Sequence, residues 1–323
     1  MLFTNHSIKP IGQKMSKAAD VQVFVQHRYA LTPAIDCWRL ARRDGAPLPP
    51  FSAGAHVEVQ IAPGVRRAYS LCSDPAHTGF YEIAVKHEVD GRGGSRALHQ
   101  LAHINSGLSI GAPRNLFALT HEPGLHVLVG AGVGLTPLIA MAHSLHHSGA
   151  AFQLIARVRQ REDLLFAPLL EQGPWHDCVT VSYSSQGALE LPDNAAHVYC
   201  CGPDGFMQAV KAHYSALPDA HWHQEHFSAS AVSTGGEHGY RLLLSASGRE
   251  IEVAAGQRLI DALRVNGVAC ETVCEQGVCG SCVVGWQDGR PRHQDECLTD
   301  EDRQSYVALC CAGCDSDSLT LEL

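Results

Sequence analysis

The sequence predicts a multi-domain protein with three consecutive units: an antiparallel β-barrel, an α/β unit with a parallel sheet, and a C-terminal unit around a cysteine-rich loop. Alternating apolar runs divided by turn residues fill the first third of the chain, and buried strands alternate with helical runs in the middle. Eight of the thirteen cysteines follow residue 269. A length of 323 residues also exceeds what a single hydrophobic core usually serves.

The first unit is expected over residues 20–119, after an extension of residues 1–19 that lacks the apolar run of a secretion signal. Runs such as HVEVQIA (56–62) and FYEIAVKH (80–87) alternate in polarity as half-buried strands do. Stretches rich in glycine, proline and aspartate separate these runs. Repeated short strands joined by turns predict an antiparallel barrel.

The second unit is expected over residues 120–228. GLHVLVGAG (124–132) indicates a buried strand that ends in a glycine turn, and LTPLIAMAHSLHH (135–147) indicates a helix. The strand AFQLIARV comes next, and the strands CVTVSYS and HVYCCGP and the helix DGFMQAVKAHYSAL follow. This alternation predicts a parallel sheet with helices on its faces.

The third unit is expected over residues 239–323, after a polar linker of residues 229–238. YRLLLSASGREIEVAAG predicts two strands around a turn, and QRLIDALRVNG predicts an amphipathic helix that ends at Gly267. SLTLEL predicts a final strand, and the cysteine loop lies between that helix and this strand.

The composition excludes several classes of protein. A net charge of −9 argues against sequence-independent nucleic-acid binding, which needs a basic face. The longest uncharged apolar run, Val127 to Ala142, is broken by glycines and a proline and is too short for a membrane span. Without a secretion signal the cysteines suit metal ligation better than a disulfide framework. We therefore expect a cytoplasmic protein without nucleic-acid or membrane partners.

The stretch CEQGVCGSC places Cys274, Cys279 and Cys282 in the C-x4-C-x2-C spacing of plant-type [2Fe–2S] proteins, which need a distant fourth thiolate. Gly277 and Gly280 permit the sharp turns of such a loop. The candidates for the fourth ligand are Cys310, Cys311 and Cys314. The pairs Cys279-x2-Cys282 and Cys311-x2-Cys314 would also suit tetrahedral zinc, so this region alone leaves both metals open.

Two further motifs suit phosphate groups. GAGVGLTP (130–137) follows a buried strand and opens a helix, where glycines let a diphosphate approach backbone donors, and CCGPDG (200–205) ends another strand of the same sheet. GAGVGLTP departs from G-x-G-x-x-G because its third glycine comes one residue early, so a purely structural turn is the alternative. In the barrel, RAYS (67–70) precedes GRGGS (91–95), which together offer a guanidinium, backbone donors and a hydroxyl. Ordinary surface and packing roles are the alternative for these residues.

These motifs, in this order, resemble the phthalate dioxygenase reductase family, the three-domain members of the ferredoxin reductase superfamily that serve oxygenases, and are similar to vanillate O-demethylase reductases. The resemblance covers Val21 to Leu323. It implies a flavin-binding barrel, a nicotinamide nucleotide domain and a C-terminal β-grasp ferredoxin domain of the plant type. The short glycine-serine pocket is similar to that of the FMN-using branch, so FMN is preferred to FAD.

The resemblance also implies the site residues. Cys310 becomes the fourth cluster ligand beside Cys274, Cys279 and Cys282, which leaves Cys270, Cys297, Cys311 and Cys314 as non-ligands. The flavin residues are Arg67, Tyr69 and Ser70, with Gly93, Gly94 and Ser95 around its phosphate and Phe227 near its ring. The nucleotide residues are Gly132, Gly134, Thr136, Cys201, Gly202 and Pro203. Arg157, Arg159 and Arg161 would suit the 2′-phosphate of NADP, but the family mostly uses NADH, which we expect here.

The implied function is that of an oxidoreductase in aromatic hydrocarbon catabolism. Electrons pass from NADH through FMN and a [2Fe–2S] cluster, one at a time, to a Rieske-type terminal oxygenase that docks transiently and acts on an aromatic or related small substrate. The cofactors carry the chemistry, so no proton-transfer residue is assigned. Glu271, Glu275, Asp295 and Glu296 are expected to form an acidic rim for docking. The alternatives are a flavin reductase or ferredoxin-type reductase for another acceptor, an NADPH-dependent version, and a zinc-binding interaction module.

Overall fold

The computed structural model describes residues 20–62, 65–88, 93–227, 238–275, 277, 279–295 and 297–323. These residues fall into two compact units, one from Asp20 to Ser230 and one from Ala231 to Leu323. The expected extension, residues 1–19, and nearly all of the expected linker lie outside the described residues. Within the described ranges no helix is both long and apolar enough to cross a membrane.

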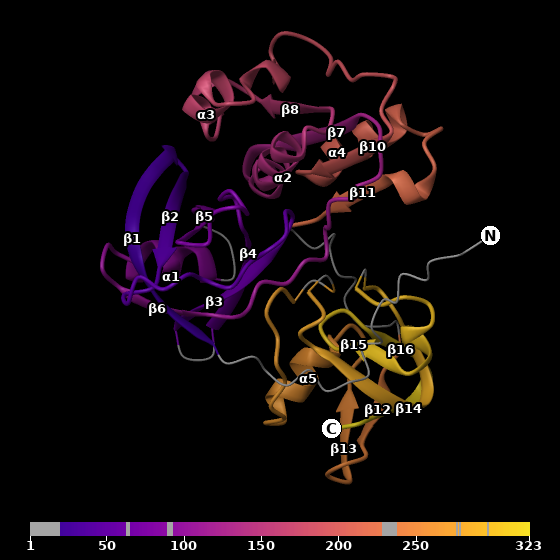
Figure 1. Ribbon diagram of the computed structural model, residues 1–323. Helices are drawn as coiled ribbons and strands as arrows, with labels where there is room; N and C mark the ends of the chain where they lie inside the picture. The colour runs from indigo at the N-terminus through magenta and orange to yellow at the C-terminus, as the bar shows by residue number, and fades with distance from the viewer. Residues whose placement is uncertain are drawn as a thin grey trace, which may run out of the picture. The chain divides into compact units, whose positions relative to one another are not determined.

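The first half of the Asp20–Ser230 unit is a six-stranded antiparallel sheet in the order β4-β3-β6-β1-β2-β5, drawn from indigo to purple in Figure 1. Leu71, just after β4, pairs with Ile83 in β5, and the Cys72 N–H donates to the Glu82 carbonyl at 2.9 Å. This contact joins the two edge strands, so the sheet closes into the barrel that the alternating runs predict. The elements are β1 (Val21–Thr32), β2 (Ile35–Ala41), β3 (His56–Ala62), β4 (Val65–Ser70), β5 (Tyr81–Lys86), α1 (Gly94–Leu101) and β6 (Gly107–Ile110).

The second half is a five-stranded sheet in the order β11-β10-β7-β8-β9, with every neighbouring pair parallel, as predicted. All five residues of β10 are buried, as expected for a strand covered on both faces. The strands are β7 (His126–Ala131), β8 (Phe152–Val158), β9 (Val179–Tyr183), β10 (His197–Cys201) and β11 (Trp222–Glu225). The helices are η1 (Gly132–Gly134), α2 (Leu135–Ser148), η2 (Arg161–Asp163), α3 (Ala167–Gln172), η3 (His176–Cys178), α4 (Asp204–His213) and η4 (Asp219–His221).

The barrel and the parallel sheet share one continuous hydrophobic core. Leu128 of β7 and Leu138 of α2 belong to the same buried cluster as Trp38 and Leu71 of the barrel. The other face of the sheet, which includes Val127 of β7, packs against α4 in a separate cluster. The shared core therefore fixes the barrel against the α2 face of the sheet.

The C-terminal unit is a five-stranded mixed sheet in the order β13-β12-β16-β14-β15, with β12 and β16 parallel and the other neighbours antiparallel. Its own core includes residues of α5 and β16. This arrangement is the β-grasp architecture that the family resemblance implies, and the cysteine loop runs between α5 and β14. The elements are β12 (Tyr240–Leu244), β13 (Arg249–Val253), α5 (Leu259–Val265), β14 (Val283–Arg292), η5 (Asp302–Gln304), β15 (Tyr306–Ala308) and β16 (Gly313–Leu321).

Candidate functional site

The cysteine loop of the C-terminal unit gathers sulfur atoms. The thiol of Cys274 is a hydrogen-bond partner of Cys279, and this bond is the main cause of a raised pKa at Cys279. Cys310 also lies beside this loop although it is distant in sequence. The Gly277 N–H donates a hydrogen bond to the Cys310 Sγ at 3.1 Å. Cys282 ends the loop just before β14 and is buried. The structure therefore brings the distant Cys310 to the loop.

Sharp backbone turns shape this loop. Gly277 and Gly280 have positive φ angles of 73° and 68°, and Glu275 also has a positive φ, of 54°. A Cβ atom at Gly277 would lie 2.7 Å from the Cys311 Sγ and 3.0 Å from the Asp295 Cα, so only glycine fits there. The predicted need for glycine at Gly277 and Gly280 is met by this geometry.

Four thiolate donors and a backbone N–H directed at one of their sulfurs fit a [2Fe–2S] cluster. Of the other cysteines, Cys311 also lies beside this loop, since its thiol is a hydrogen-bond partner of Cys310. The thiol of Cys311 donates to the Ala308 carbonyl at 3.6 Å, and that of Cys314 to the carbonyls of Ser316 and Ser318 at 3.2 and 3.5 Å. The second pair of a tetrahedral zinc site would need both thiols beside the loop. The position of Cys314 therefore does not favour the zinc alternative.

Two arginines hold the loop to α5. Glu275 pairs with Arg264 at 2.6 Å and with Arg258 at 3.8 Å, and Arg258 also donates to the Cys310 carbonyl at 3.2 Å. Arg258 thus links the loop to the chain segment of the fourth cysteine. The Asp295 side chain is fully buried and accepts a hydrogen bond from the Leu298 N–H at 3.0 Å.

The expected acidic rim is therefore wrong for Asp295, which is not exposed, and Glu275 faces its two arginines rather than a partner. Glu271 is exposed, and Glu296 lies outside the described residues.

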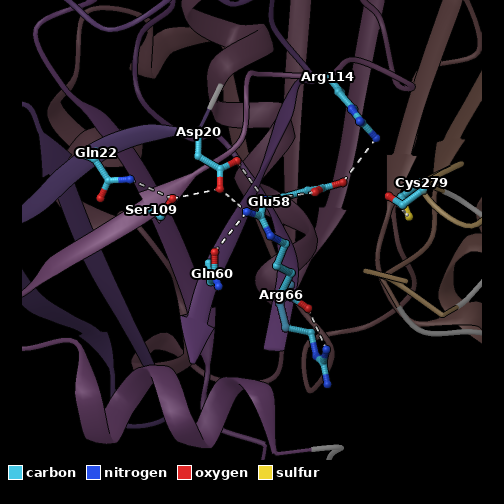
Figure 2. Close-up of polar contacts among 10 residues, drawn as sticks. Asp20, Gln22, Glu58, Gln60, Arg66, Ser109, Arg114 and Cys279 are labelled. Carbon is cyan, nitrogen blue, oxygen red and sulfur yellow. Dashed lines mark hydrogen bonds and ion pairs between the residues drawn. The ribbon is translucent and has the colours of Figure 1, made fainter. Parts of the chain in front are cut away.

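In the barrel, consecutive arginines on β4 have different surroundings. Arg66 pairs with Asp20, donates to the Gln60 Oε1 at 3.1 Å and lies 3.7 Å from Glu58, while Ser109 also donates to Asp20 (Figure 2). Arg66 is thus part of the polar network that ties the strands together. Neighbouring residues of a strand point to opposite faces, so Arg67 lies on the other side of β4.

Arg67 reaches the start of α1. A Cβ atom at Gly94 would lie 2.6 Å from the Arg67 Nε, so the guanidinium arm covers this glycine. Gly93 precedes the helix with a φ of 82°, and no side chain caps the helix N-terminus. Ser95 accepts a hydrogen bond from the Glu88 N–H at 3.2 Å. A cation beside the start of a helix is a suitable arrangement for a phosphate group.

Tyr69 and Ser70 complete the barrel motif. The hydroxyl of Tyr69 is buried and has no hydrogen-bond partner among the described residues, and burial raises the pKa of this phenol. A buried polar atom without a partner indicates a bound group that supplies one, which fits a flavin at this position. Ser70 donates from its Oγ to the Glu225 Oε2 at 3.3 Å.

Glu225 is a site residue that the sequence analysis missed. It ends β11 and pairs in register with Cys201 of β10. Burial raises the pKa of its carboxyl group to about 8, so the group is largely protonated at neutral pH. Strand β11 was not predicted from the sequence, so the available signal was the place of Glu225 two residues before Phe227, which the family resemblance puts near the flavin. Phe227 itself packs against the core that the barrel and α2 share.

The predicted nucleotide residues form two loops in contact at the carboxyl ends of β7 and β10. A Cβ atom at Gly134 would lie 2.5 Å from the carbonyl carbon of Cys201 and 2.9 Å from the amide nitrogen of Gly202. Gly132 has a φ of 55° and open space around its Cα, whereas Thr136 is buried and donates to the Val133 carbonyl at 2.9 Å. Gly132 thus leaves room for a ligand, and Thr136 holds the turn.

Pro203 of the second loop lies directly before α4. The thiol of Cys201 is buried, and this burial raises its pKa.

The three arginines at the end of β8 and just after it mostly have protein partners. Arg157 donates to the Ser182 Oγ at 2.5 Å and to the Gly187 carbonyl at 2.8 Å. Arg161 pairs with Glu171, with a second contact at 2.8 Å, while Arg159 is exposed. Two of the three cations therefore already have protein partners.

Comparisons with known proteins agree with this geometry. A model of the 2Fe-2S iron-sulfur cluster binding domain matches residues 243–314. The phenoxybenzoate dioxygenase subunit beta of Ectopseudomonas oleovorans is 39% identical over 88% of this chain and 91% of its own length. The solved structure of phthalate dioxygenase reductase is described as a modular structure for electron transfer from pyridine nucleotides to [2Fe-2S]. It matches 94% of this chain and 98% of that chain with a TM-score of 0.72, and the two sequences are 30% identical.

An intact type IV self-sufficient cytochrome P450 monooxygenase also matches, at 32% identity and a TM-score of 0.80 over 94% of this chain. The chain spans only 41% of the length of that protein. The matches confirm the predicted oxidoreductase fold with its C-terminal iron–sulfur domain, and the chain belongs to the phthalate dioxygenase reductase family of oxygenase reductases.

Proposed function

We propose that this chain is the reductase component of a Rieske-type oxygenase, in which electrons pass from NADH through FMN and a [2Fe–2S] cluster to the oxygenase. One observation carries the proposal: Ser70 of the predicted flavin motif lies 3.3 Å from Glu225, whose strand neighbour Cys201 belongs to the predicted nucleotide site. Transfer of a hydride requires donor and acceptor sites that nearly touch. A barrel and a parallel sheet on one shared core meet this requirement.

In this proposal Arg67 and the start of α1 hold the flavin phosphate, and Tyr69 directs its hydroxyl to the bound group. A bound flavin supplies the ability to accept two electrons together and to release them singly. The Ser70 hydroxyl and the neutral carboxyl group of Glu225 form a hydrogen-bonded pair that holds a proton beside the flavin site. The sequence analysis assigned no proton-transfer residue, and this pair is proposed in addition.

The nucleotide is proposed to be NADH rather than NADPH. A 2′-phosphate requires free cations near the ribose, but Arg157 is engaged with Ser182 and Gly187, and Arg161 with Glu171. Gly132 offers open backbone for the diphosphate, and the contact between Gly134 and the loop at Cys201 sets the shape of the site.

The cluster is proposed to be held by Cys274, Cys279, Cys282 and Cys310. The hydrogen bond from the Gly277 N–H to the Cys310 Sγ supports Cys310 over Cys311, because backbone donors to thiolates are usual in such loops. The thiol of Cys311 donates to the Ala308 carbonyl and also lies beside Cys310, so the bond from Gly277 is the feature that separates the two candidates. The fit of the donors to a cluster also disfavours a zinc-binding interaction module.

The terminal acceptor is proposed to be a Rieske oxygenase that acts on an aromatic or related small substrate and docks transiently. The similarity to part of a cytochrome P450 monooxygenase favours one second candidate, a heme-containing oxygenase. The two acceptors are distinguished by mixing the reduced protein with an oxygenase of each type and following reoxidation. Faster electron transfer to the Rieske protein supports the proposal.

The central experiment is an anaerobic titration of the purified protein with NADH, followed by visible and electron paramagnetic resonance spectra, with analysis of flavin, iron, sulfide and zinc. We expect bound FMN, two irons and two sulfides per chain, loss of flavin absorbance and a reduced-cluster signal. Zinc without acid-labile sulfide, or bleaching by NADPH alone, would contradict the proposal.

A further inference from the structure

Outside the electron-transfer site, one carboxylate oxygen has three histidine nitrogens around it. The Oδ2 atom of Asp74 lies 3.2 Å from the His77 Nδ1, 3.4 Å from the His147 Nε2 and 3.8 Å from the His143 Nδ1. Ligand atoms of Asp74, His143 and His147 all lie within 4.8 Å of one another. Asp74 follows β4 of the barrel, whereas His143 and His147 lie on α2, so the cluster joins the two halves of the Asp20–Ser230 unit.

These spacings are those of metal ligands. Bonds of about 2.0–2.1 Å from tetrahedral zinc to nitrogen or oxygen place neighbouring donor atoms about 3.3 Å apart. The distances from the Asp74 Oδ2 to the three nitrogens bracket this value. Small side-chain movements would therefore centre an ion between Asp74, His143 and His147, and His77 would turn its ring from beside Asp74 to become the fourth donor.

The backbone directs the donors toward one another. The second carboxylate oxygen of Asp74, Oδ1, accepts a hydrogen bond from the Ala76 N–H at 3.0 Å, and the Asp74 carbonyl accepts one from the His77 N–H at 3.0 Å. This turn leaves Oδ2 for the histidines. His143 and His147 are four residues apart on α2, so their rings share one face of the helix, as in the H-x3-H pairs of zinc proteins.

The contacts and the exposure of the cluster also suit a metal. The indole N–H of Trp175 donates to the His143 Nδ1 at 3.4 Å, which keeps a lone pair on that nitrogen, and an ion would replace this long contact. Side chains of His77 and His147 are 67% and 44% exposed, so an ion can enter from solvent.

We propose that Asp74, His143 and His147, with His77 as the fourth donor, form a binding site for Zn²⁺ or a similar borderline divalent ion. Three imidazoles and one carboxylate match zinc and exclude the oxygen-rich sites of calcium and magnesium. The ion links the turn after β4 to α2, the helix that begins at the predicted nucleotide loop. It thereby holds the barrel against the nucleotide half, and this role does not depend on the identity of the electron acceptor.

The experiment is calorimetric titration of the chelator-treated and desalted holoprotein with Zn²⁺. We expect the wild type to bind one equivalent of Zn²⁺. His147→Gln should weaken the affinity for Zn²⁺ by about 100-fold, because a lost ligand removes a direct bond to the ion. Asp74→Asn, which retains an acceptor for the Ala76 N–H, should weaken binding by a similar factor. The matched control is His213→Gln, since His213 is exposed, lies outside the cluster and contacts Asp193 at 3.3 Å and the edge of the Tyr214 ring.

A second readout is the fluorescence of Trp175, whose ring lies edge-on to His143 with centroids 5.4 Å apart. Co²⁺ should quench part of the tryptophan emission in the wild type and in His213→Gln but not in His147→Gln. Zn²⁺ should raise the melting temperature of the same two proteins only. The proposal would be overturned if the wild type and His147→Gln bound Zn²⁺ with equal stoichiometry and affinity. In that case the ion would be held by free thiols instead. If His147→Gln does not fold, the more exposed His77→Gln carries the same comparison.

Discussion

The substitution Gly134→Ala tests whether the loops after β7 and β10 form the nucleotide site. A Cβ atom at this position would lie 2.5 Å from the carbonyl carbon of Cys201 and closer still to its oxygen, against 3.4 Å or more for ordinary contact. The two loops must therefore separate by about 1 Å, and overpacking of this kind costs about 1–3 kcal/mol. Since 1.4 kcal/mol corresponds to a factor of ten, we expect the Kd for NADH to rise by about tenfold or more.

The assay is anaerobic stopped-flow reduction of the bound flavin over a range of NADH concentrations, with the melting temperature measured in parallel. The control is Gly79→Ala in the barrel, just before β5, where an added Cβ meets nothing within 4 Å. We expect Gly79→Ala to match the wild type in NADH affinity and flavin reduction. If Gly134→Ala is folded and binds NADH with wild-type affinity, these loops do not form the nucleotide site and the reasoning fails.

Three further predictions test other parts of the site. The native state holds a proton on Glu225 that the unfolded state releases, so this residue lowers the stability of the fold as pH rises from about 4.5 towards 8. Glu225→Gln should remove this dependence of the melting temperature on pH. It should also remove any change near pH 8 in the rate of flavin reduction. Cys310→Ser should lose most of the iron and sulfide, whereas Cys311→Ser should retain both, as metal analysis would show; the reverse pattern would assign the fourth ligand to Cys311. Arg67→Gln should weaken FMN binding by about 10- to 100-fold in a fluorescence titration, whereas Arg66→Gln should lower the melting temperature and leave FMN affinity unchanged, because Arg66 pairs with Asp20.

The barrel, the parallel sheet and the order of the motifs could be predicted from the sequence because each depends on local patterns. Alternating polarity marks β3 and β5, and an apolar run that ends in glycines marks β7 and α2. Strand β14 was not anticipated, because Gly285, Gly289 and Pro291 interrupt it and its pairing with β16 has two register shifts. Helix α4 ends at His213 rather than at the predicted Leu217, since the chain turns at Tyr214.

The misjudged site residues depend on contacts between distant segments. Glu225 reaches Ser70 across 155 positions of sequence, and only the register of β11 on β10 and the packing of the barrel bring the two together. Asp295 looked like an exposed acid because its sequence neighbours are polar, but Arg303 and the Leu298 N–H surround it in the fold. A pattern within a short window cannot report either contact.

The two compact units differ in how precisely they must position the groups that exchange electrons. Hydride transfer fails when the reacting groups are misplaced by about 1 Å, so the flavin and nucleotide sites need a rigid common support. The core that joins Leu71 of the barrel to Leu138 of α2 supplies this support, and Ser70 is the residue directly before Leu71. The cluster unit has a core of its own, in which α5 holds the cysteine loop through Arg258 and Glu275. The chemistry that needs contact between two cofactors thus lies within one packed unit, and single-electron transfer is assigned to a unit that packs separately.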